Sequence, residues 1–261
     1  MKTIDLERYP IDQPGSAAYR RLLERCQAAL AASGACVLDG FMKPEHLPAV
    51  VAEVEPNLGN AFYKTKSHSP YLIKDDDAYP PDHPRNRKQM TNSATLAYDW
   101  IPDGSVLNGL YTWPAFQNFL ARLLGFDKLY PYADALAPIN ILVYNEGCQT
   151  GWHFDVATFV VTLLLQSPEG GAGFEFAPFI RGDGGENYDV VDAVLEGRSD
   201  DIQELRQPAG ALVVFRGSRT LHRVTPVTGS RPRLVAVFSY APEQGKVLDA
   251  HTRETFYGRV A

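Results

Sequence analysis

Apolar side chains recur at spacings of three and four residues near the start of the chain, as on one face of a helix. They are Tyr19, Leu22, Leu23, Cys26 and Leu30. Ser16 precedes this run, where a helix N-cap is favoured, and Gly34 follows it, where a left-handed C-terminal cap is expected. The pattern therefore predicts a first helix between Ser16 and Gly34.

Three further elements are indicated before residue 130. The run ACVLDGF (35–41) is typical of a short strand. Pro44 is placed to open a second helix that continues through AVVAEVE (49–55), and PAFQNFLARLLG (114–125) reads as an apolar helix ending at Gly125. The first half of the chain is therefore expected to be mainly helical.

Residues 64–90, KTKSHSPYLIKDDDAYPPDHPRNRKQM, are rich in proline and charge and show no usable hydrophobic period. An irregular segment of this length inside a compact domain is usually a lid, a binding loop or disordered. We therefore predict a lid over residues 64–90.

After residue 130 the pattern changes to short apolar runs separated by glycine and proline, which indicates strands and turns. The expected strands are 139–145, 157–166, 173–180, 211–217, 222–227 and 233–241, with a helical insertion near 189–197. Many short strands joined by turns predict a sandwich, barrel or jelly roll. The fold class is thus mainly β with flanking helices (α+β), with a double-stranded β-helix, or jelly roll, at its core.

With 261 residues, of which 45% are apolar, the chain is long enough for one large domain or two small ones. We expect a single domain over residues 1–261. It has a helical N-terminal part with the lid (1–130), a jelly-roll core (131–245) and a C-terminal tail (246–261).

The net charge and the cysteine content limit which binding partners and which cellular compartment are expected. A net charge of -6 and a pI near 5.5 argue against nucleic acid and anionic membranes, and favour a small-molecule substrate.

Cys26, Cys36 and Cys148 are odd in number and lack CxxC spacing, so they suggest neither a disulfide framework nor a zinc site. MKTIDLERYP has no apolar targeting segment, and no apolar run is long enough for a bilayer. We expect a cytoplasmic protein, and a homodimer remains open.

The strongest chemical signal is a histidine and an aspartate two residues apart in GWHFD (151–155), followed much later by a lone histidine. These residues are His153, Asp155 and His222. Residues two apart on an extended segment point to the same face. A jelly roll can bring the strand that carries His222 alongside. Two neutral imidazoles and one carboxylate on one face of a metal are the ligands of non-haem Fe(II) oxygenases.

An H-x-D tripeptide also occurs often by chance, and a histidine beside an aspartate is commonly a hydrogen-bonded surface pair. The wider context favours a metal site in this chain. The remaining histidines, which lack such a partner pattern, are interpreted as solvated or lid residues. They are His46, His68, His83 and His251.

An arginine near the start of the last core strand adds to this signal. In RPRLVAVFSY (231–240), alternation places Arg233, Val235 and Val237 on one face, so Arg233 can point into the cavity that holds the metal. A guanidinium there suits the carboxylate of an organic diacid. Arg231 has the same parity and is the alternative, although it precedes Pro232 and is expected in the turn. An edge-strand charge that blocks aggregation is the other explanation.

Two residues of the strand INILVYN (139–145) are further candidates for the same carboxylate. Tyr144 lies nine residues before His153, and its hydroxyl is able to donate to the diacid; a core tyrosine is the equally good alternative. Asn140 shares the parity of Tyr144 and is a weaker candidate.

With these motifs, the chain resembles the Fe(II)/2-oxoglutarate-dependent oxygenase superfamily. Within it, the chain is most similar to the BesD/HalD-type group of free-amino-acid halogenases and their hydroxylase relatives. The resembling stretches are DHPRNR (82–87), YADALAPINILVYNEGCQTGWHFD (132–155), TLLLQSPEGGAGFEF (162–176), LHRVTPVTGSRPRLVAVFSY (221–240) and HTRETFYGR (251–259). The resemblance implies a double-stranded β-helix, Fe(II) as metal, and 2-oxoglutarate and O2 as cosubstrates.

The chain departs from the halogenases of this group at one ligand. Their acidic ligand is replaced by a small residue, which opens a coordination position for chloride, whereas this chain has Asp155. A carboxylate there leaves no chloride position. The resemblance therefore implies hydroxylation, with release of succinate and carbon dioxide.

The resemblance also implies a free L-amino acid as substrate, with lysine or another basic amino acid as a possibility. Such a substrate needs a cation for its carboxylate and acids for its amines. Arg85 or Arg87 in the lid and Asp134 before the first core strand are candidates, and Trp152 and Glu175 are further pocket candidates. Ordinary solvated charges or packing explain each of them as well.

Two alternatives stay open. One is a different reaction on the same iron, such as desaturation, halogenation or oxidation of another metabolite. The other is a non-catalytic jelly-roll protein that binds metal or ligand. A zinc hydrolase is disfavoured, because no motif of the HExxH kind is present.

Overall fold

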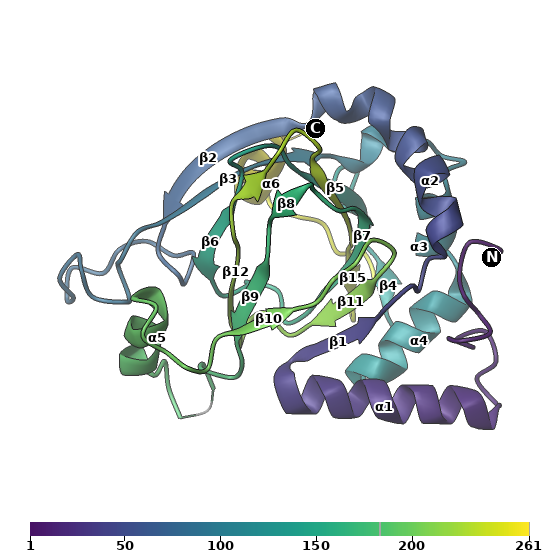
Figure 1. Ribbon diagram of the computed structural model, residues 1–261, viewed down its shortest axis with the longest axis horizontal. Helices are drawn as coiled ribbons and strands as arrows, with labels where there is room; N and C mark the ends of the chain where they lie inside the picture. Colours follow the sequence, from purple (N-terminus) through teal and green to yellow (C-terminus); the bar gives the residue numbers. More distant parts are fainter. Residues whose placement is uncertain (183, 261) are drawn as a thin grey trace.

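The computed structural model describes residues 1–182 and 184–260, and its centre is a barrel of two antiparallel sheets (Figure 1). The larger sheet has the order β1-β11-β7-β14-β5-β3-β2 and the smaller has the order β10-β9-β12-β6. In Figure 1, β6 and β12 lie on one side of the barrel, and β5 and β7 lie on the other. The predicted fold class, mainly β with flanking helices around a jelly-roll core, is confirmed.

The bounds of the strands are as follows. The larger sheet contains β1 (Ala35–Leu38), β2 (Phe62–His68), β3 (Gln89–Leu96), β5 (Ile139–Tyr144), β7 (Val160–Gln166), β11 (Leu212–Phe215) and β14 (Arg233–Phe238). The smaller sheet contains β6 (Thr150–His153), β9 (Phe174–Ala177), β10 (Gln203–Leu205) and β12 (Leu221–Val224). Two short pairs join β8 (Gly170–Gly171) to β13 (Val227–Thr228) and β4 (Tyr130–Pro131) to β15 (Tyr240–Ala241).

The helices lie around this barrel. They are α1 (Ala17–Ser33), α2 (Leu47–Val54), α3 (Val106–Tyr111), α4 (Pro114–Leu124), α5 (Tyr188–Leu195) and α6 (Ala250–Tyr257), with 3₁₀ turns η1 (Pro44–His46), η2 (Glu55–Asn60) and η3 (Tyr98–Trp100). None of the helices in the described part of the chain combines the length and apolar character that crossing a membrane requires.

Both predicted caps of α1 are present in the structure. The Ser16 side chain accepts a hydrogen bond from the Tyr19 amide, and Gly34 adopts the left-handed conformation with φ 75°. The buried face of α1 packs against α4, where the rings of Tyr19 and Phe119 meet edge to face with centroids 6.2 Å apart. Burial of this apolar stripe attaches the N-terminal helices to the larger sheet.

Each of the six strand ranges predicted after residue 130 contains a strand, and the predicted helical insertion is α5. The prediction for residues 64–90 was wrong at both ends, because β2 and the start of β3 fall inside that range. β2 is the edge strand of the larger sheet and is mostly exposed on both faces, so it has no hydrophobic alternation to detect. The irregular loop is therefore residues 69–88.

The first half of the chain is also less helical than expected, since β1, β2 and β3 complete the larger sheet. Strands from both halves of the chain thus share one sheet and one apolar core. The C-terminal tail contains α6, which the sequence pattern did not reveal.

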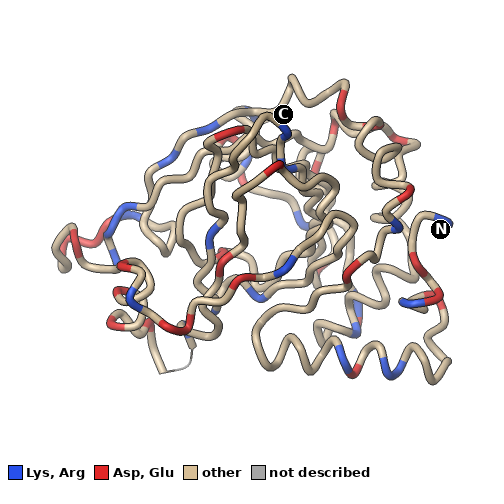
Figure 2. The backbone as a smooth tube through the Cα atoms, viewed as in Figure 1, with Lys and Arg blue, Asp and Glu red and all other residues tan. Residues whose placement is uncertain are grey.

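Loop 69–88 packs against α5 (Figure 1). Arg87 forms ion pairs with Asp192 at 2.6 Å and Glu196 at 3.2 Å, and the ring of His83 lies 4.7 Å from that of Tyr188. Figure 2 shows acidic and basic residues close together in this region. Loop and helix therefore form one ordered cap beside β6.

Candidate metal centre

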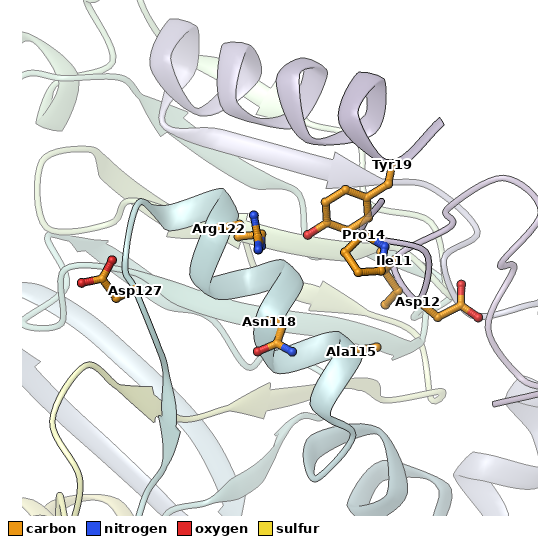
Figure 3. Close-up of a pocket in the computed structure, with 8 residues that line it drawn as sticks. All are labelled: Ile11, Asp12, Pro14, Tyr19, Ala115, Asn118, Arg122 and Asp127. Carbon is orange, nitrogen blue, oxygen red and sulfur yellow. The ribbon is translucent and has the colours of Figure 1, made fainter. Parts of the chain in front are cut away.

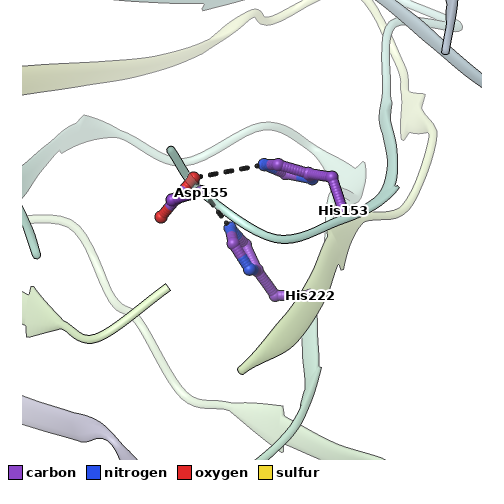
Figure 4. Close-up of side chains that lie close together, drawn as sticks. All are labelled: His153, Asp155 and His222. Carbon is purple, nitrogen blue, oxygen red and sulfur yellow. Dashed lines mark ion pairs between the residues drawn. The ribbon is translucent and has the colours of Figure 1, made fainter. Parts of the chain in front are cut away.

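The register of two strands brings the candidate metal ligands together. β12 and β6 are antiparallel neighbours in which His222 lies directly opposite His153, and the two imidazole centroids are 4.1 Å apart. Asp155 follows the end of β6, and its Oδ1 lies 3.4 Å from Nε2 of each histidine (Figure 4). The three ligand atoms lie within 4.8 Å of one another, so the side chains singled out in the sequence converge.

Backbone hydrogen bonds fix the orientation of both rings. Nδ1 of His153 lies 2.9 Å from the Gly151 carbonyl oxygen, and Nδ1 of His222 lies 2.9 Å from the Thr220 carbonyl oxygen. A carbonyl only accepts, so each Nδ1 carries a hydrogen and each neutral ring directs its Nε2 lone pair at Asp155. Two lone pairs and a carboxylate that face one another require a proton or a cation between them. The arrangement therefore fits a divalent metal ion.

The carboxyl group of Asp155 is ionised in this environment. Burial by itself raises the pKa of Asp155, but while protons on the imidazoles stand in for the cation, the charge interaction with His222 and the hydrogen bonds from both imidazoles outweigh burial. The pKa of Asp155 is therefore held well below its usual range. A metal ligand must be deprotonated, and this group meets that condition at neutral pH.

Gly217 leaves the space that the Asp155 carboxylate occupies. A Cβ atom at Gly217 would lie 1.8 Å from Oδ2 of Asp155, which no side chain can do without displacing it. The Gly217 carbonyl also accepts a hydrogen bond of 3.0 Å from the Asp155 amide. Gly217 was expected only as the last residue of the strand 211–217, and its role beside Asp155 depends on the folded position of residue 217.

Aromatic side chains surround His222. The ring of Phe174 stacks on it with centroids 5.5 Å apart, and the ring of Phe215 meets it edge to face at 4.8 Å. These rings limit the access of water to the ligands and lower the local dielectric constant, which strengthens the interaction of the ligands with a cation.

Arg233 is buried without an anion. Its side chain is opposite Tyr144 in the β14–β5 register, its guanidinium carbon lies 5.6 Å from the Tyr144 ring, and the residue is 5% exposed. Over residues 1–182 and 184–260, its hydrogen bond is the 2.7 Å contact with Gln207 Oε1, and no carboxylate pairs with it. Burial lowers the pKa of Arg233, but a guanidinium stays charged. A buried cation with free donors indicates a site for an anion.

Tyr144 connects Arg233 to the metal ligands. Its hydroxyl shares a 2.9 Å hydrogen bond with Thr150 Oγ1. Burial raises the pKa of Tyr144, Arg233 lowers it, and the charge of Asp155 is among the causes that raise it. The Tyr144 hydroxyl therefore reaches from the larger sheet to β6, the strand that ends at His153. The sequence offered no signal for Thr150 or Gln207.

The two weaker candidates for the same anion lie elsewhere. Arg231 is exposed and donates to the carbonyl of Pro168, in the turn before β14. The amide of Asn140 donates to the Leu136 carbonyl, and its oxygen accepts from the Tyr257 hydroxyl, so its hydrogen bonds lead to α6. Among the described residues, neither side chain forms a hydrogen bond with Arg233.

Two substrate candidates are part of structural ion pairs. Asp134 accepts hydrogen bonds from Arg253 and from two backbone amides, and Arg87 is paired with the acids of α5. Neither has a free charge for a ligand, so the structure corrects the substrate role expected for Asp134 and Arg87.

Trp152 and Glu175 lie on the outer face of the smaller sheet. Side chains alternate along β6, so Trp152 points away from the face that carries His153. Trp152 packs in an apolar cluster with Phe154, and Arg223 lies 4.8 Å above its ring. Glu175 is opposite Arg223 in the register and pairs with it at 2.6 Å. Both residues are structural here, which corrects their assignment to the pocket.

Arg85 differs from the other substrate candidates. Its Nη1 atom is buried, yet no partner for it exists in the described part of the chain, and the same is true of the Tyr71 hydroxyl. The Arg85 guanidinium lies 5.9 Å from the Tyr71 ring, and that ring lies 5.3 Å from the ring of Phe154, the residue between the first two ligands. Two donors without a partner among the described residues therefore lie at the apolar cluster of Trp152 and Phe154.

His68 was interpreted as a solvated or lid residue, and the structure corrects this interpretation. It ends β2 at 7% exposure, and its ring lies 6.2 Å from that of His153 in an edge-to-face arrangement. Its position next to a ligand depends on the pairing of β2 with β3, for which the sequence gave no pattern.

A groove of about 320 Å³ lies away from these residues, between the N-terminal segment and α4 (Figure 3). Its lining includes Tyr19, Asn118 and Arg122, and none of the candidate ligands. The metal-binding arrangement is therefore separate from this groove.

Comparisons with known proteins agree with the fold and the ligand set. Residues 21–258 match the model of the HalD (halogenase D) family. No curated protein matches the sequence.

Several solved structures are similar to this one. The 2-oxoglutarate-dependent epimerase SnoN from nogalamycin biosynthesis has a TM-score of 0.57 at 16% identity, covering 85% of this chain and 81% of its own. A 2OG-Fe(II) oxygenase-family oxidoreductase from Burkholderia pseudomallei has a TM-score of 0.53 at 14% identity, covering 85% and 92%. A Pseudomonas putida prolyl-4-hydroxylase has a TM-score of 0.51 at 15% identity, covering 83% and 97%. At these identities the likeness shows a shared fold.

The fold and the ligand set define an enzyme of the Fe(II)- and 2-oxoglutarate-dependent oxygenase class. The match over residues 21–258 shows that the chain belongs to the HalD family.

Proposed function

We propose that this protein hydroxylates an unactivated C–H bond of a free L-amino acid, with lysine or another basic amino acid as the first candidate. Fe(II) is the metal, and 2-oxoglutarate and O2 are cosubstrates, with succinate and carbon dioxide as coproducts. The proposal is carried by the convergence of His153, Asp155 and His222. It is supported by buried Arg233, which has no anion among the described residues and lies beside Tyr144, whose hydroxyl bonds to β6.

The chain's part in the reaction begins with holding the metal. His153, Asp155 and His222 would hold it, and the hydrogen bonds from Nδ1 of each histidine to the backbone keep each Nε2 directed toward the Asp155 carboxylate. Bound iron, together with 2-oxoglutarate and O2, supplies the oxidising power for C–H cleavage.

Arg233 anchors the cosubstrate. Its free donors are suited to the distal carboxylate of 2-oxoglutarate, which a guanidinium binds through two parallel hydrogen bonds. Gln207 orients the guanidinium, and the Tyr144 hydroxyl is close enough to the same interior to donate to that carboxylate. The diacid is thereby fixed with its other end toward the metal.

Asp155 favours hydroxylation over halogenation. Its carboxylate lies in the space left by Gly217 and meets both histidines at 3.4 Å. Because a protein carboxylate holds this coordination position, no position is left there for chloride, although the family is named for halogenation.

Arg85 and Tyr71 are proposed to bind the carboxylate of the amino acid. Among residues 1–182 and 184–260, both have a buried donor without a partner, and burying such donors costs free energy unless a ligand satisfies them. Arg181 also lies 5.6 Å from the rings of Tyr71 and Phe154, but it is already paired with Glu186 at 2.9 Å, so the proposed contact depends on Arg85 and Tyr71. A free amino acid supplies the anion that these residues lack.

The proposal is tested by anaerobic reconstitution with Fe(II) and 2-oxoglutarate, followed by exposure to O2 with a panel of free amino acids and mass spectrometry. We expect one amino acid to gain a single oxygen atom, with one succinate formed per product. A desaturated or chlorinated product would contradict hydroxylation. Metal binding without turnover across a broad panel of amino acids and other small metabolites would favour a non-catalytic protein.

An Arg85→Gln variant tests the substrate assignment. We expect a higher KM for the amino acid and an unchanged Kd for 2-oxoglutarate, because Arg85 lies apart from Arg233. Arg87→Gln is the matched control, since Arg87 is already paired with α5.

A further inference from the structure

A chain of hydrogen bonds joins the start of loop 69–88 to the strand that carries the first metal ligand. Nδ1 of His68 lies 2.9 Å from the Ser69 carbonyl oxygen, and Nε2 of His68 lies 2.8 Å from Thr91 Oγ1. Thr91 Oγ1 in turn accepts a 3.0 Å hydrogen bond from the Gly151 amide. The Gly151 carbonyl is the acceptor for Nδ1 of His153.

Each bond in this chain has only one possible direction. The Ser69 carbonyl can only accept, so Nδ1 of His68 carries the hydrogen and Nε2 of the neutral ring is an acceptor. The Thr91 hydroxyl must therefore donate to His68, which leaves its oxygen free to accept from Gly151. Burial lowers the pKa of His68, which agrees with the neutral ring that this arrangement requires.

A second contact joins the same two segments. The amide of Phe154 donates a 2.8 Å hydrogen bond to the Pro70 carbonyl, between the ligands His153 and Asp155. Leu72, two residues further along the loop, holds a left-handed backbone with φ 57° and donates to the Ser69 carbonyl. A non-glycine residue in this conformation is strained, so the surrounding contacts must hold the turn in place.

We infer that His68 and Thr91 are positioning residues for the metal ligand His153. Through them, loop 69–88 and the metal centre are held as one unit. Neither residue binds the metal in this arrangement. Their role is to fix the position of the Gly151 backbone, and with it the direction of the carbonyl group that orients the His153 ring. The inference rests on the proposed metal site, but its test needs no turnover.

β3 supplies a matched control for Thr91. Thr95 lies on the same face of β3, four residues further along, and is also buried. Its hydroxyl has no hydrogen-bond partner in the part of the chain that the structure describes. Thr91→Val and Thr95→Val therefore make the same chemical change in the same strand, and only the first removes a hydrogen bond.

The experiment measures Co(II) affinity and the visible absorption of bound Co(II), with no cosubstrate present. Thr91→Val is expected to weaken Co(II) binding by about 10- to 100-fold and to shift the absorption bands, as loss of a residue that orients a metal ligand does. Thr95→Val should match the unchanged protein, and Thr91→Ser, which keeps the hydroxyl, should restore it. Co(II) affinity and spectrum in Thr91→Val equal to those in Thr95→Val would overturn the inference.

His68→Asn breaks the series of hydrogen bonds at a different point. This variant replaces Thr91→Val in the experiment if Thr91→Val does not fold. An asparagine amide can keep the hydrogen bond to the Ser69 carbonyl, but it cannot reach Thr91 as Nε2 does. The same loss of Co(II) affinity is expected.

Hydrogen exchange tests the connection to the loop. Co(II) should slow exchange at the amides of Leu72 and Phe154 in the unchanged protein, and this protection should be lost in Thr91→Val and His68→Asn. Equal protection by the metal in all variants would show that the loop and the ligand are independent. If the protein proved not to be an oxygenase, these results would still stand, since none of them depends on 2-oxoglutarate.

Discussion

Two buried polar clusters in this barrel contain similar residue types but differ in how their hydrogen-bonding capacity is used. One is the metal centre of His153, Asp155 and His222 with Arg233 nearby. The other, the C-terminal cluster, consists of Asp134, Asn140, Arg253 and Tyr257. Asp134 accepts from Leu136, Leu248 and Arg253, each at 2.8 Å, and Tyr257 donates to Asn140 at 2.8 Å.

The C-terminal cluster is satisfied within the protein, whereas the metal centre is not. In the former, the side chains attach α6 and the segment before it to the barrel, and no charge is left for a ligand. In the latter, two lone pairs face a carboxylate, and a buried guanidinium has no anion among the described residues. Buried polar groups therefore indicate a binding site when their hydrogen bonds are incomplete, and a structural role when they are complete.

The largest effect is expected from Asp155→Ala. Loss of one of three ligands should weaken Fe(II) or Co(II) binding by more than the roughly 10- to 100-fold that loss of an orienting residue costs, and abolish oxygenation. Isothermal titration with Co(II) measures this, and metal affinity within a factor of two of the original would refute the ligand assignment.

Arg233→Ala should act on the cosubstrate instead of the metal. Removing one partner of a buried, hydrogen-bonded charge pair costs about 2 to 5 kcal/mol of binding, so the Kd for 2-oxoglutarate should rise by at least about tenfold while Co(II) affinity is retained. Arg231→Ala is the control, since Arg231 is exposed in the turn. Equal 2-oxoglutarate affinity in both variants would place the diacid elsewhere.

Gly217→Ala tests the space for the carboxylate. The added methyl group must displace Asp155, so Co(II) affinity should fall by about 10-fold or more. Gly104→Ala, whose Cβ would meet nothing within 4 Å, should have no effect. In an Asp155→Gly background the Gly217→Ala change should cost little further affinity, and an additive loss would show that Gly217 acts through something other than Asp155.

Asp134→Asn should change stability and leave binding intact. Breaking this buried pair with Arg253 is expected to lower the free energy of unfolding by about 3 kcal/mol, with 2-oxoglutarate and Co(II) affinities unchanged. Burial raises the pKa of Asp134, but the hydrogen bonds from Leu136, Leu248 and Arg253 outweigh it and lower that pKa below its usual value.

The pH dependence of Asp134 has a definite sign. A carboxyl group with a lowered pKa in the folded state stabilises the protein above its unfolded pKa, about 4, and this contribution is lost as the pH falls through the folded pKa. Urea unfolding between neutral pH and pH about 3 should therefore show a shallower loss of stability in Asp134→Asn than in the unchanged protein. If stability fell with pH to the same extent in both proteins, Asp134 would not be responsible for this pH dependence.

The sequence was sufficient to single out the three side chains that converge, and for His153 and Asp155 the rule is local. His153 and Asp155 are two residues apart on extended chain, and His222 lies in the next strand of the smaller sheet, directly opposite His153. Alternation also placed Arg233 correctly in the strand. Patterns of this kind can be recognised in the sequence without knowledge of the tertiary fold.

Other features depend on contacts that no local pattern encodes. β2 is an exposed edge strand, so neither it nor the position of His68 beside His153 could be read from hydrophobic periodicity. Asn140 has the same parity as Tyr144, yet its amide is used by Leu136 and Tyr257. The sequence showed which residues are polar and point inward, but only the fold shows whether a partner has already satisfied them.

Tyr257→Phe gives the smallest expected effect and the sharpest test of this distinction. The variant keeps the buried ring and removes only the hydroxyl that donates to Asn140 Oδ1, so the free energy of unfolding should fall by about 1 kcal/mol. The Kd for 2-oxoglutarate should not change if Asn140 belongs to the C-terminal cluster. If removal of the hydroxyl changed 2-oxoglutarate binding without any loss of stability, Asn140 would instead belong beside Arg233, as the sequence predicted. Urea unfolding and titration calorimetry on the same preparation measure the two quantities.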